Sequence, residues 1–271
     1  MTNLWSDVRE VYGSAWAFAF ACPLLFLVPV LAEFAQHVVE IDLGLYDSLA
    51  GAKAAESHPA RMAWGFAKTL AITLPTYWFY RYVISGRDAA YARRLDGRAL
   101  ALWGAIYLVM SVALGWLGIF GLDLGGLLGL EGSALTIVRI ALAVGQIAVG
   151  IYLVAWFVAW SQGNAAIGPV RSLRIMRGFF WRTAGLMVCA ILPLMVLHYA
   201  GLFAIGRPQW AVWTIMLLDS FVVGFLALTI AGANAVAAQR AASVRGISLL
   251  SGREAPERGS ATVAGAQPTG C

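Results

Sequence analysis

Ionisable side chains inside apolar stretches are the first candidates for chemistry in this sequence. An ionised group at the centre of a bilayer costs about 2.5–3.5 kcal/mol, so each one needs a reason. Two acids, two bases and a histidine fall within long apolar runs: Glu33, Lys68, Arg139, His198 and Asp219. When the runs cross the bilayer in alternating directions, at about 1.5 Å of rise per helical residue, all five fall in the same half of the membrane. Asp219 lies deepest, about 13 Å from the outer end of its run. We therefore expect one polar layer inside a helical bundle.

This polar layer has two interpretations. In the first, buried ion pairs and hydrogen bonds fix which helices are neighbours, and the long side chains of Lys68 and Arg139 extend towards the surface. In the second, the layer is an outward-facing cavity for a lipid headgroup, an ion or a proton, with His37 and Gln146 near it. Asp219 is too short to reach the surface, so without a partner it should be protonated. The sequence leaves both interpretations open.

Signatures of catalysis and of metal binding are missing from the sequence. It holds no HExxH, no GxSxG followed by a suitable Asp and His, no P-loop and no glycine-rich dinucleotide turn. The three histidines and three cysteines lack the spacing of metal ligands or of a disulfide framework. We therefore expect a protein without catalytic residues, metal or cofactor.

The elements that position the polar layer follow from composition. Of 271 residues, 61% are hydrophobic and 12% are charged, whereas soluble domains carry about 25% charged residues. A soluble fold of this composition would expose large apolar patches. The net charge is +5. The arginines that produce it fall where loops would meet lipid headgroups, and this distribution argues against nucleic acid as a partner.

Six apolar runs are long enough to cross about 30 Å of hydrocarbon as helices. The predicted spans are residues 15–37, 63–83, 99–120, 134–160, 183–205 and 210–238. Tryptophans near the ends of the runs are typical of interfacial belts. The sequence thus predicts an all-α polytopic membrane protein with one membrane domain, residues 1–250, and a disordered tail, residues 251–271.

Orientation follows from the arginines, because short loops rich in Lys and Arg stay in the cytoplasm. Fourteen arginines fall on one side: Arg9, Arg81, Arg87, Arg93, Arg94, Arg98, Arg171, Arg174, Arg177, Arg182, Arg240, Arg245, Arg253 and Arg258. The other three connections hold only Lys53, Arg61 and Arg207. We therefore expect a bacterial inner-membrane protein with both termini in the cytoplasm and the polar layer in the outer half of the bilayer.

Two shorter segments have the pattern of amphipathic helices at the inner surface. Residues 4–12 place apolar side chains on one face, and residues 170–181 place apolar side chains opposite arginines. Such helices lie in the interface, with their basic side chains on anionic phosphates. The predicted contacts with anionic headgroups are Arg171, Arg174, Arg177 and Arg182.

The segment 163–189 carries a family resemblance. It reads GNAAIGPVRSLRIMRGFFWRTAGLMVC, and the matching positions are Gly168, Ser172, Leu173, Arg177, Gly178, Phe180 and Trp181. This pattern, together with the order of helices, resembles the YciC-like superfamily, which includes the membrane domain of some glycerophosphodiester phosphodiesterases. The resemblance implies a six-span membrane domain without catalytic residues of its own.

Two functions remain from the sequence. The first is an accessory or scaffold subunit of a membrane complex, or an envelope-maintenance protein, with other membrane subunits as partners. The alternative is a transporter or lipid-handling protein that uses the polar layer.

Overall fold

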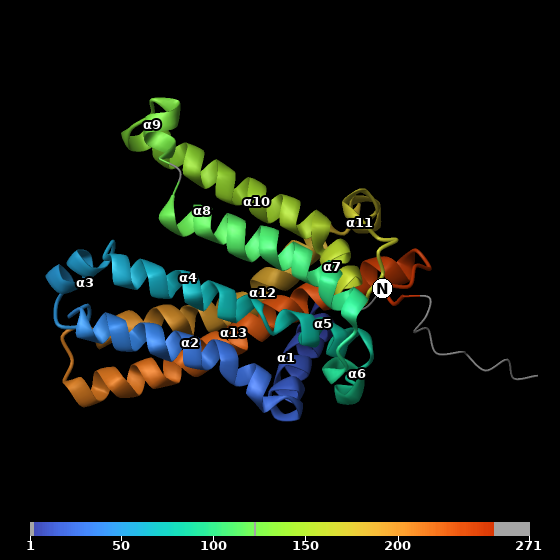
Figure 1. Cartoon of the computed structure of the whole chain (residues 1–271), viewed down its shortest axis with the longest axis horizontal. Helices are drawn as coiled ribbons and strands as arrows, with labels where there is room; N and C mark the ends of the chain where they lie inside the picture. The colour runs from blue at the N-terminus through green and yellow to red at the C-terminus, as the bar shows by residue number, and fades with distance from the viewer. Residues whose placement is uncertain (1–2, 122, 252–271) are drawn as a thin grey trace, which may run out of the picture.

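The computed structural model describes residues 3–121 and 123–251, which form helices and no strand (Figure 1). The prediction of an all-α polytopic fold is confirmed. The first helices are α1 (Leu4–Ala21), α2 (Pro23–Asp42), α3 (Leu49–Ala55), α4 (Pro59–Thr73), α5 (Thr76–Ile84), α6 (Ala89–Arg93), α7 (Gly97–Tyr107), the π-helical turn η1 (Leu108–Ala113) and α8 (Leu114–Phe120). They are followed by α9 (Leu124–Leu128), α10 (Gly132–Ser161), α11 (Pro169–Met176), α12 (Phe180–Tyr199), the 3-10 turn η2 (Ala200–Ala204) and α13 (Gln209–Val244).

Five helical segments of the described chain are long and apolar enough to cross a membrane. They are Pro23–Asp42, Gly97–Phe120, Gly132–Ser161, Phe180–Ala204 and Gln209–Val244. The remaining predicted span, residues 63–83, is divided between two consecutive helices, α4 and α5. Neither of them is long enough to cross a membrane alone.

The division between α4 and α5 has a local cause. Pro75 lacks a backbone N–H, and its ring clashes with the preceding turn of the helix. Hydroxyl groups donate to carbonyls near this break: Thr73 donates to the carbonyl of Thr69 over 3.0 Å, and Tyr107 of α7 donates to that of Leu70 over 3.0 Å. A break of this kind is compatible with a bilayer because neighbouring groups satisfy the freed carbonyls.

The N-terminal region differs from the expected surface helix followed by a separate span. Residues 4–21 form one helix, α1, and the chain bends at Cys22 before Pro23 starts α2. Asp7, expected off the apolar face, is buried and pairs with Arg182 and Arg240. These ion pairs hold α1 against α12 and α13, so α1 belongs to the bundle.

The helix α13 forms the centre of the bundle and packs against α1, α2, α5, α10 and α12. Small residues allow this close packing. A Cβ atom added to Gly224 would lie 2.5 Å from Val30 Cγ2 of α2, and one added to Gly232 would lie 3.1 Å from Val11 Cγ1 of α1. The crossing of α2 and α13 at Gly224 therefore depends on the missing side chain.

The N-terminal half of α10 protrudes from this centre. No residue between Glu131 and Gly150 is buried, and Figure 1 shows α8 and α10 diverging from the other helices towards α9. Apolar side chains on opposite faces of α10 are exposed, with Ile137 and Ile140 on one side and Leu142 and Val149 on the other. This half of α10 has the surface of a helix that meets lipid or another protein all round.

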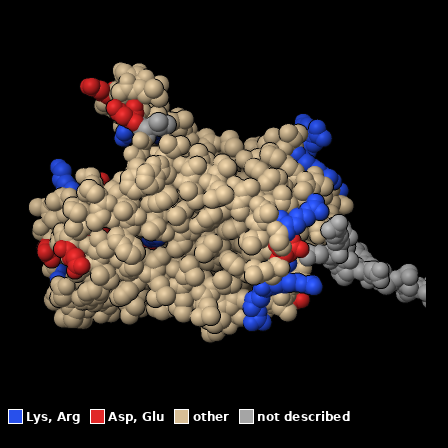
Figure 2. Space-filling model, in the orientation of Figure 1, with Lys and Arg blue, Asp and Glu red and all other residues tan. Residues whose placement is uncertain are grey.

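Charged side chains gather at the two ends of the molecule, and the broad face between them is almost free of them (Figure 2). Both ends of the described chain lie at the same end of the bundle (Figure 1). The helix α11 lies at this end too, and it stops at Met176 because Gly178 adopts a φ of 82°. The expected amphipathic helix 170–181 is thus shorter, and Phe180 and Trp181 begin α12. The tail predicted as disordered lies outside the described residues, apart from Ser251.

Candidate functional site

Four polar side chains of α2 form one stripe. Glu33, Gln36, His37 and Glu40 follow a spacing of three, four and seven residues, which places them on one face of a helix. All four are buried. Since α2 packs against α4 and α13, the stripe faces the interior of the bundle.

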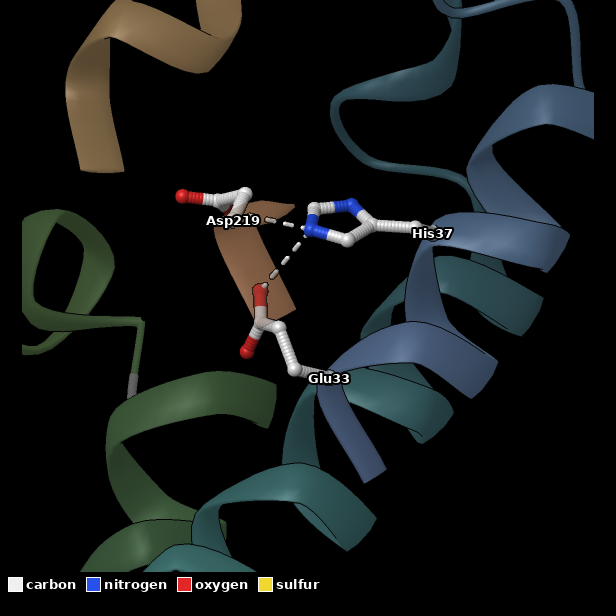
Figure 3. Close-up of side chains that lie close together, drawn as sticks. All are labelled: Glu33, His37 and Asp219. Carbon is white, nitrogen blue, oxygen red and sulfur yellow. Dashed lines mark hydrogen bonds and ion pairs between the residues drawn. The ribbon is translucent and has the colours of Figure 1, made fainter. Parts of the chain in front are cut away.

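His37 is the centre of the site, and both of its ring nitrogens contact carboxylates. Nδ1 lies 3.0 Å from Glu40 Oε2 and 3.1 Å from the hydroxyl of Tyr46. Nε2 lies 3.0 Å from Asp219 Oδ2 and 3.4 Å from Glu33 Oε1 (Figure 3). A neutral imidazole has only one N–H, so one nitrogen would turn a lone pair towards a carboxylate unless a cation or a second proton lies there.

Asp219 connects His37 to the other side of the site. It lies on α13, is 5% exposed, and also accepts from His198 of α12, whose Nδ1 is 2.9 Å from Oδ1 and 3.0 Å from Oδ2. The two histidines thus approach one aspartate from different helices. A Cβ atom at Gly201 of η2 would lie 3.9 Å from Asp219 Cγ and 3.5 Å from Met216 Cε, which are ordinary contact distances.

The two glutamates of α2 are paired with basic side chains of α4. Lys68 Nζ lies 3.0 Å from Glu33 Oε2, and Arg61 Nε donates to Glu40 Oε1 over 2.9 Å. Tyr46, in the loop after α2, donates to Glu40 Oε2 over 3.0 Å. Burial and the adjacent Glu40 raise the pKa of Tyr46, so its hydroxyl stays protonated and keeps donating.

We name these side chains the buried polar cluster: Glu33, Gln36, His37, Glu40, Tyr46, Arg61, Lys68, His198 and Asp219. The cluster holds three carboxylates, one arginine and one lysine, so its formal charge is −1 when both histidines are neutral. It lines a cavity of about 380 Å³ at the end of the bundle remote from the chain ends. Lys53 and Glu56 of the α3 region, and Tyr199 and Leu202 of the α12–η2 segment, also line it.

The structure brings together four of the five residues singled out from the sequence, namely Glu33, Lys68, His198 and Asp219. Arg139 is not among them: it is exposed on the protruding half of α10 and does not line the cavity. Gln146, expected nearby, is also exposed on α10. Depth in the membrane alone does not say which helices are neighbours, and α10 stands apart from α2.

The four arginines expected at anionic headgroups divide into two groups. Arg171, Arg174 and Arg177 are exposed at the end of the molecule that carries the chain ends. Arg182 instead pairs with the buried Asp7 over 2.6 Å. This pairing gives Arg182 a place in the packing of α1 against α12.

Sequence reasoning missed the central place of His37 and the participation of Glu40, Tyr46 and Arg61. A signal was present, because Glu33, His37 and Glu40 share one face of a helix at positions i, i+4 and i+7. Reading residues only by their depth in the membrane hid this stripe, since Glu40 lies beyond the end of the predicted first span.

The arrangement suits two kinds of chemistry. A chain of hydrogen-bonded carboxylates and imidazoles can hold a proton and pass it along. The same groups are ligands for divalent cations, and one oxygen or nitrogen from each of Glu33, His37 and Asp219 lies within 4.8 Å of the others. The spacing of histidines in the sequence had argued against any metal site, but the fold places ligands from α2 and α13 side by side.

Comparison of the chain with protein-family models, curated proteins and solved structures finds no match. The YciC-like resemblance therefore stays a prediction.

Proposed function

We propose that the protein binds a small charged ligand, an ion or a lipid headgroup, in the cavity at the end of its bundle, as part of transport or lipid handling. The observation that carries the proposal is the cavity itself, lined by three buried carboxylates and two histidines from α2, α12 and α13. These three segments are long and apolar enough to span a membrane.

The cost of the cluster supports binding over a purely structural role. Ionisable groups on spanning helices are expensive and commonly mark pathways for ions or substrates. Ion pairs that served only to fix helix neighbours would gain from tight packing, because water and space around them weaken their attraction. The cluster instead borders a cavity of about 380 Å³.

The wall of the cavity supports access from two directions. Lys53, Glu56 and Arg61 lie on the short α3–α4 side, where a charged ligand would meet groups of both signs. Tyr199 and Leu202 lie on the other side and are 61% and 60% exposed. An amphiphile could place its headgroup at the polar cluster and its chain along these apolar side chains.

We propose a bacterial inner-membrane location with both chain ends in the cytoplasm, which turns the cavity outward. The arginine distribution supports this orientation, and Arg171, Arg174 and Arg177 would then meet anionic lipid at the inner surface. Fluorescent-protein and alkaline-phosphatase fusions at the two termini test it. Fluorescence without phosphatase activity at both termini is expected, and the opposite result at either terminus would overturn the assignment.

A second candidate function, an accessory subunit of a membrane complex, is favoured by α10. Its N-terminal half is exposed on all sides and carries Arg139 and Gln146, polar groups that usually face a partner or water inside a membrane. A complex should then co-purify in gentle detergent through this half of α10. A lone monodisperse monomer under those conditions would count against this function.

The binding proposal is tested by native mass spectrometry of the full-length protein released from lipid nanodiscs. Wild-type protein should retain a small-molecule or lipid adduct that Asp219→Asn loses. Glu131→Gln is the matched control, because it removes an exposed carboxylate and leaves the cluster intact. Circular dichroism confirms that both variants are folded. A wild-type protein without adduct, or an adduct retained equally in Asp219→Asn, would refute the proposal.

A further inference from the structure

We infer that Glu33, His37 and Asp219 form a binding site for a divalent transition-metal cation at the floor of the cavity. This inference rests on the proposed ligand-binding function of the same cavity and names the chemical class of the ligand.

The contacts of His37 call for a positive charge between its Nε2 atom and two carboxylates. Glu40 lies 3.0 Å from Nδ1 and accepts its proton, so Nε2 of a neutral ring turns its lone pair towards Asp219 and Glu33. A proton on Nε2 can be donated well to only one of these two oxygens. A cation satisfies all three atoms at once.

The distances fit such a cation. Imidazole nitrogens and carboxylate oxygens bind zinc at about 2.0–2.2 Å, which separates the ligand atoms of a tetrahedral site by about 3.3–3.6 Å. His37 Nε2 lies 3.4 Å from Glu33 Oε1 and 3.0 Å from Asp219 Oδ2. Small rotations of the side chains would complete the geometry, since the ligand atoms already lie within 4.8 Å of one another.

Each of the three ligands has its own orienting partner. Glu40 holds His37 through Nδ1, Lys68 holds Glu33, and His198 holds Asp219. A carboxylate that accepts from the far nitrogen of a ligating histidine is a recurrent feature of metal sites, where it fixes the ring and raises its basicity. Hydrogen bonding to all three candidate ligands distinguishes this site from a chance group of acids.

The remaining side of the site faces the cavity. Three protein ligands leave a fourth position for water or for a solute that the cavity admits. One imidazole and two carboxylates favour cations such as Zn²⁺ and Mn²⁺ over Cu⁺, which prefers sulfur ligands. The cluster charge of −1 with neutral histidines becomes +1 with the cation, which would also attract an anionic headgroup.

The test measures Zn²⁺ and Mn²⁺ binding to full-length protein in neutral-lipid nanodiscs, by calorimetry and by elemental analysis after desalting. Wild-type protein should bind one ion per chain, and His37→Gln and Asp219→Asn should abolish binding. Glu40→Gln should weaken it about 10–100-fold, as loss of an orienting group does in other sites. Arg139→Gln is the matched control and should bind as wild type, since Arg139 lies outside the cavity.

Two further measurements separate the possible failures. X-ray absorption of the Zn²⁺-loaded wild type should show nitrogen and oxygen ligands with a single imidazole, which keeps the inference testable if a variant fails to fold. Wild-type protein that binds no metal but keeps an adduct dependent on Asp219 would overturn the metal site and leave the proposed function standing. Wild-type protein that carries neither metal nor adduct would overturn both the metal site and the proposed function.

Discussion

The crossing of α2 and α13 at Gly224 offers the sharpest test of how the fold holds the site. In Gly224→Ala the new Cβ would lie 2.5 Å from Val30 Cγ2 and 3.0 Å from Phe26 Cε2, whereas ordinary contact begins at 3.4 Å. Val30 is buried and, as a β-branched residue in a helix, has one strongly preferred rotamer. The helices must therefore separate by roughly 1 Å, because overpacking of this kind is relieved by backbone shifts.

The magnitude follows from two opposing contributions. Replacing glycine by alanine within a helix stabilises it by about 0.8–1.0 kcal/mol, and overpacking costs about 1–3 kcal/mol. Gly145→Ala measures the first contribution alone, because nothing lies within 4 Å of a Cβ at Gly145 on α10. We expect Gly224→Ala to be less stable than Gly145→Ala by about 1–3 kcal/mol.

The same separation should disturb the site. His37 lies on α2 and Asp219 on α13, and their contact of 3.0 Å spans this crossing. We expect Gly224→Ala to weaken Zn²⁺ binding about tenfold, the change that a loss of about 1.4 kcal/mol produces. Unfolding in a denaturing detergent, followed by tryptophan fluorescence, and calorimetry in nanodiscs measure the two effects. Equal stability and equal affinity in the two alanine variants would refute the packing argument.

Three further predictions concern contacts outside the α2–α13 crossing. Asp7→Ala removes the buried carboxylate that Arg182 and Arg240 share, while Arg240 keeps Glu10. Removal of one member of a buried ion network costs about 3–5 kcal/mol, and we expect a loss near the lower end of this range in the same unfolding titration. Tyr107→Phe removes the hydrogen bond that joins α7 to a carbonyl of α4 and should cost about 0.6 kcal/mol, the average for such bonds between membrane helices. Arg139→Gln should change the free energy of unfolding by less than about 0.5 kcal/mol, as for exposed positions in general.

Each of these predictions has a distinct contrary result. A stable Asp7→Ala protein would mean that apolar packing, the Glu10–Arg240 ion pair and the Tyr12–Ala190 hydrogen bond are enough to hold α1. A loss of several kcal/mol in Tyr107→Phe would show that the α4–α5 break depends on this single hydroxyl. Strong destabilisation by Arg139→Gln would place Arg139 in a contact that the monomer does not contain.

Hydropathy was sufficient to predict the all-α polytopic fold, because burial in lipid requires long apolar helices. It was also sufficient to find Glu33, Lys68, His198 and Asp219, since each stands out against apolar neighbours. It could not show that Arg139 lies apart from them, because the same depth in a bilayer is compatible with any lateral position. Neighbouring helices are chosen by close packing, as at Gly224, and this information does not appear in a hydropathy pattern.

The contacts within the buried polar cluster were harder to predict from the sequence than the residues that make it up. Glu40 and Tyr46 lie at the end of α2 and just beyond it, where polar residues are ordinary and attract no notice. Their importance comes from His37, whose two ring nitrogens connect them to Asp219, 182 residues further along the chain. Contacts of such sequence separation depend on the fold and leave no local signal.

The central position of α13 has a consequence for biosynthesis. Among the described helices it is the last to leave the ribosome. Yet it contributes more buried residues than any other described helix and contacts α1, α2, α5, α10 and α12. Helices that are inserted earlier therefore lack their central neighbour until α13 is synthesised. At that stage Glu33 and His37 are already in the membrane, and Asp219 has not yet been made. A nascent chain that stalls before residue 209 lacks α13 and Asp219, so the bundle and the buried polar cluster can be completed only after α13 is made.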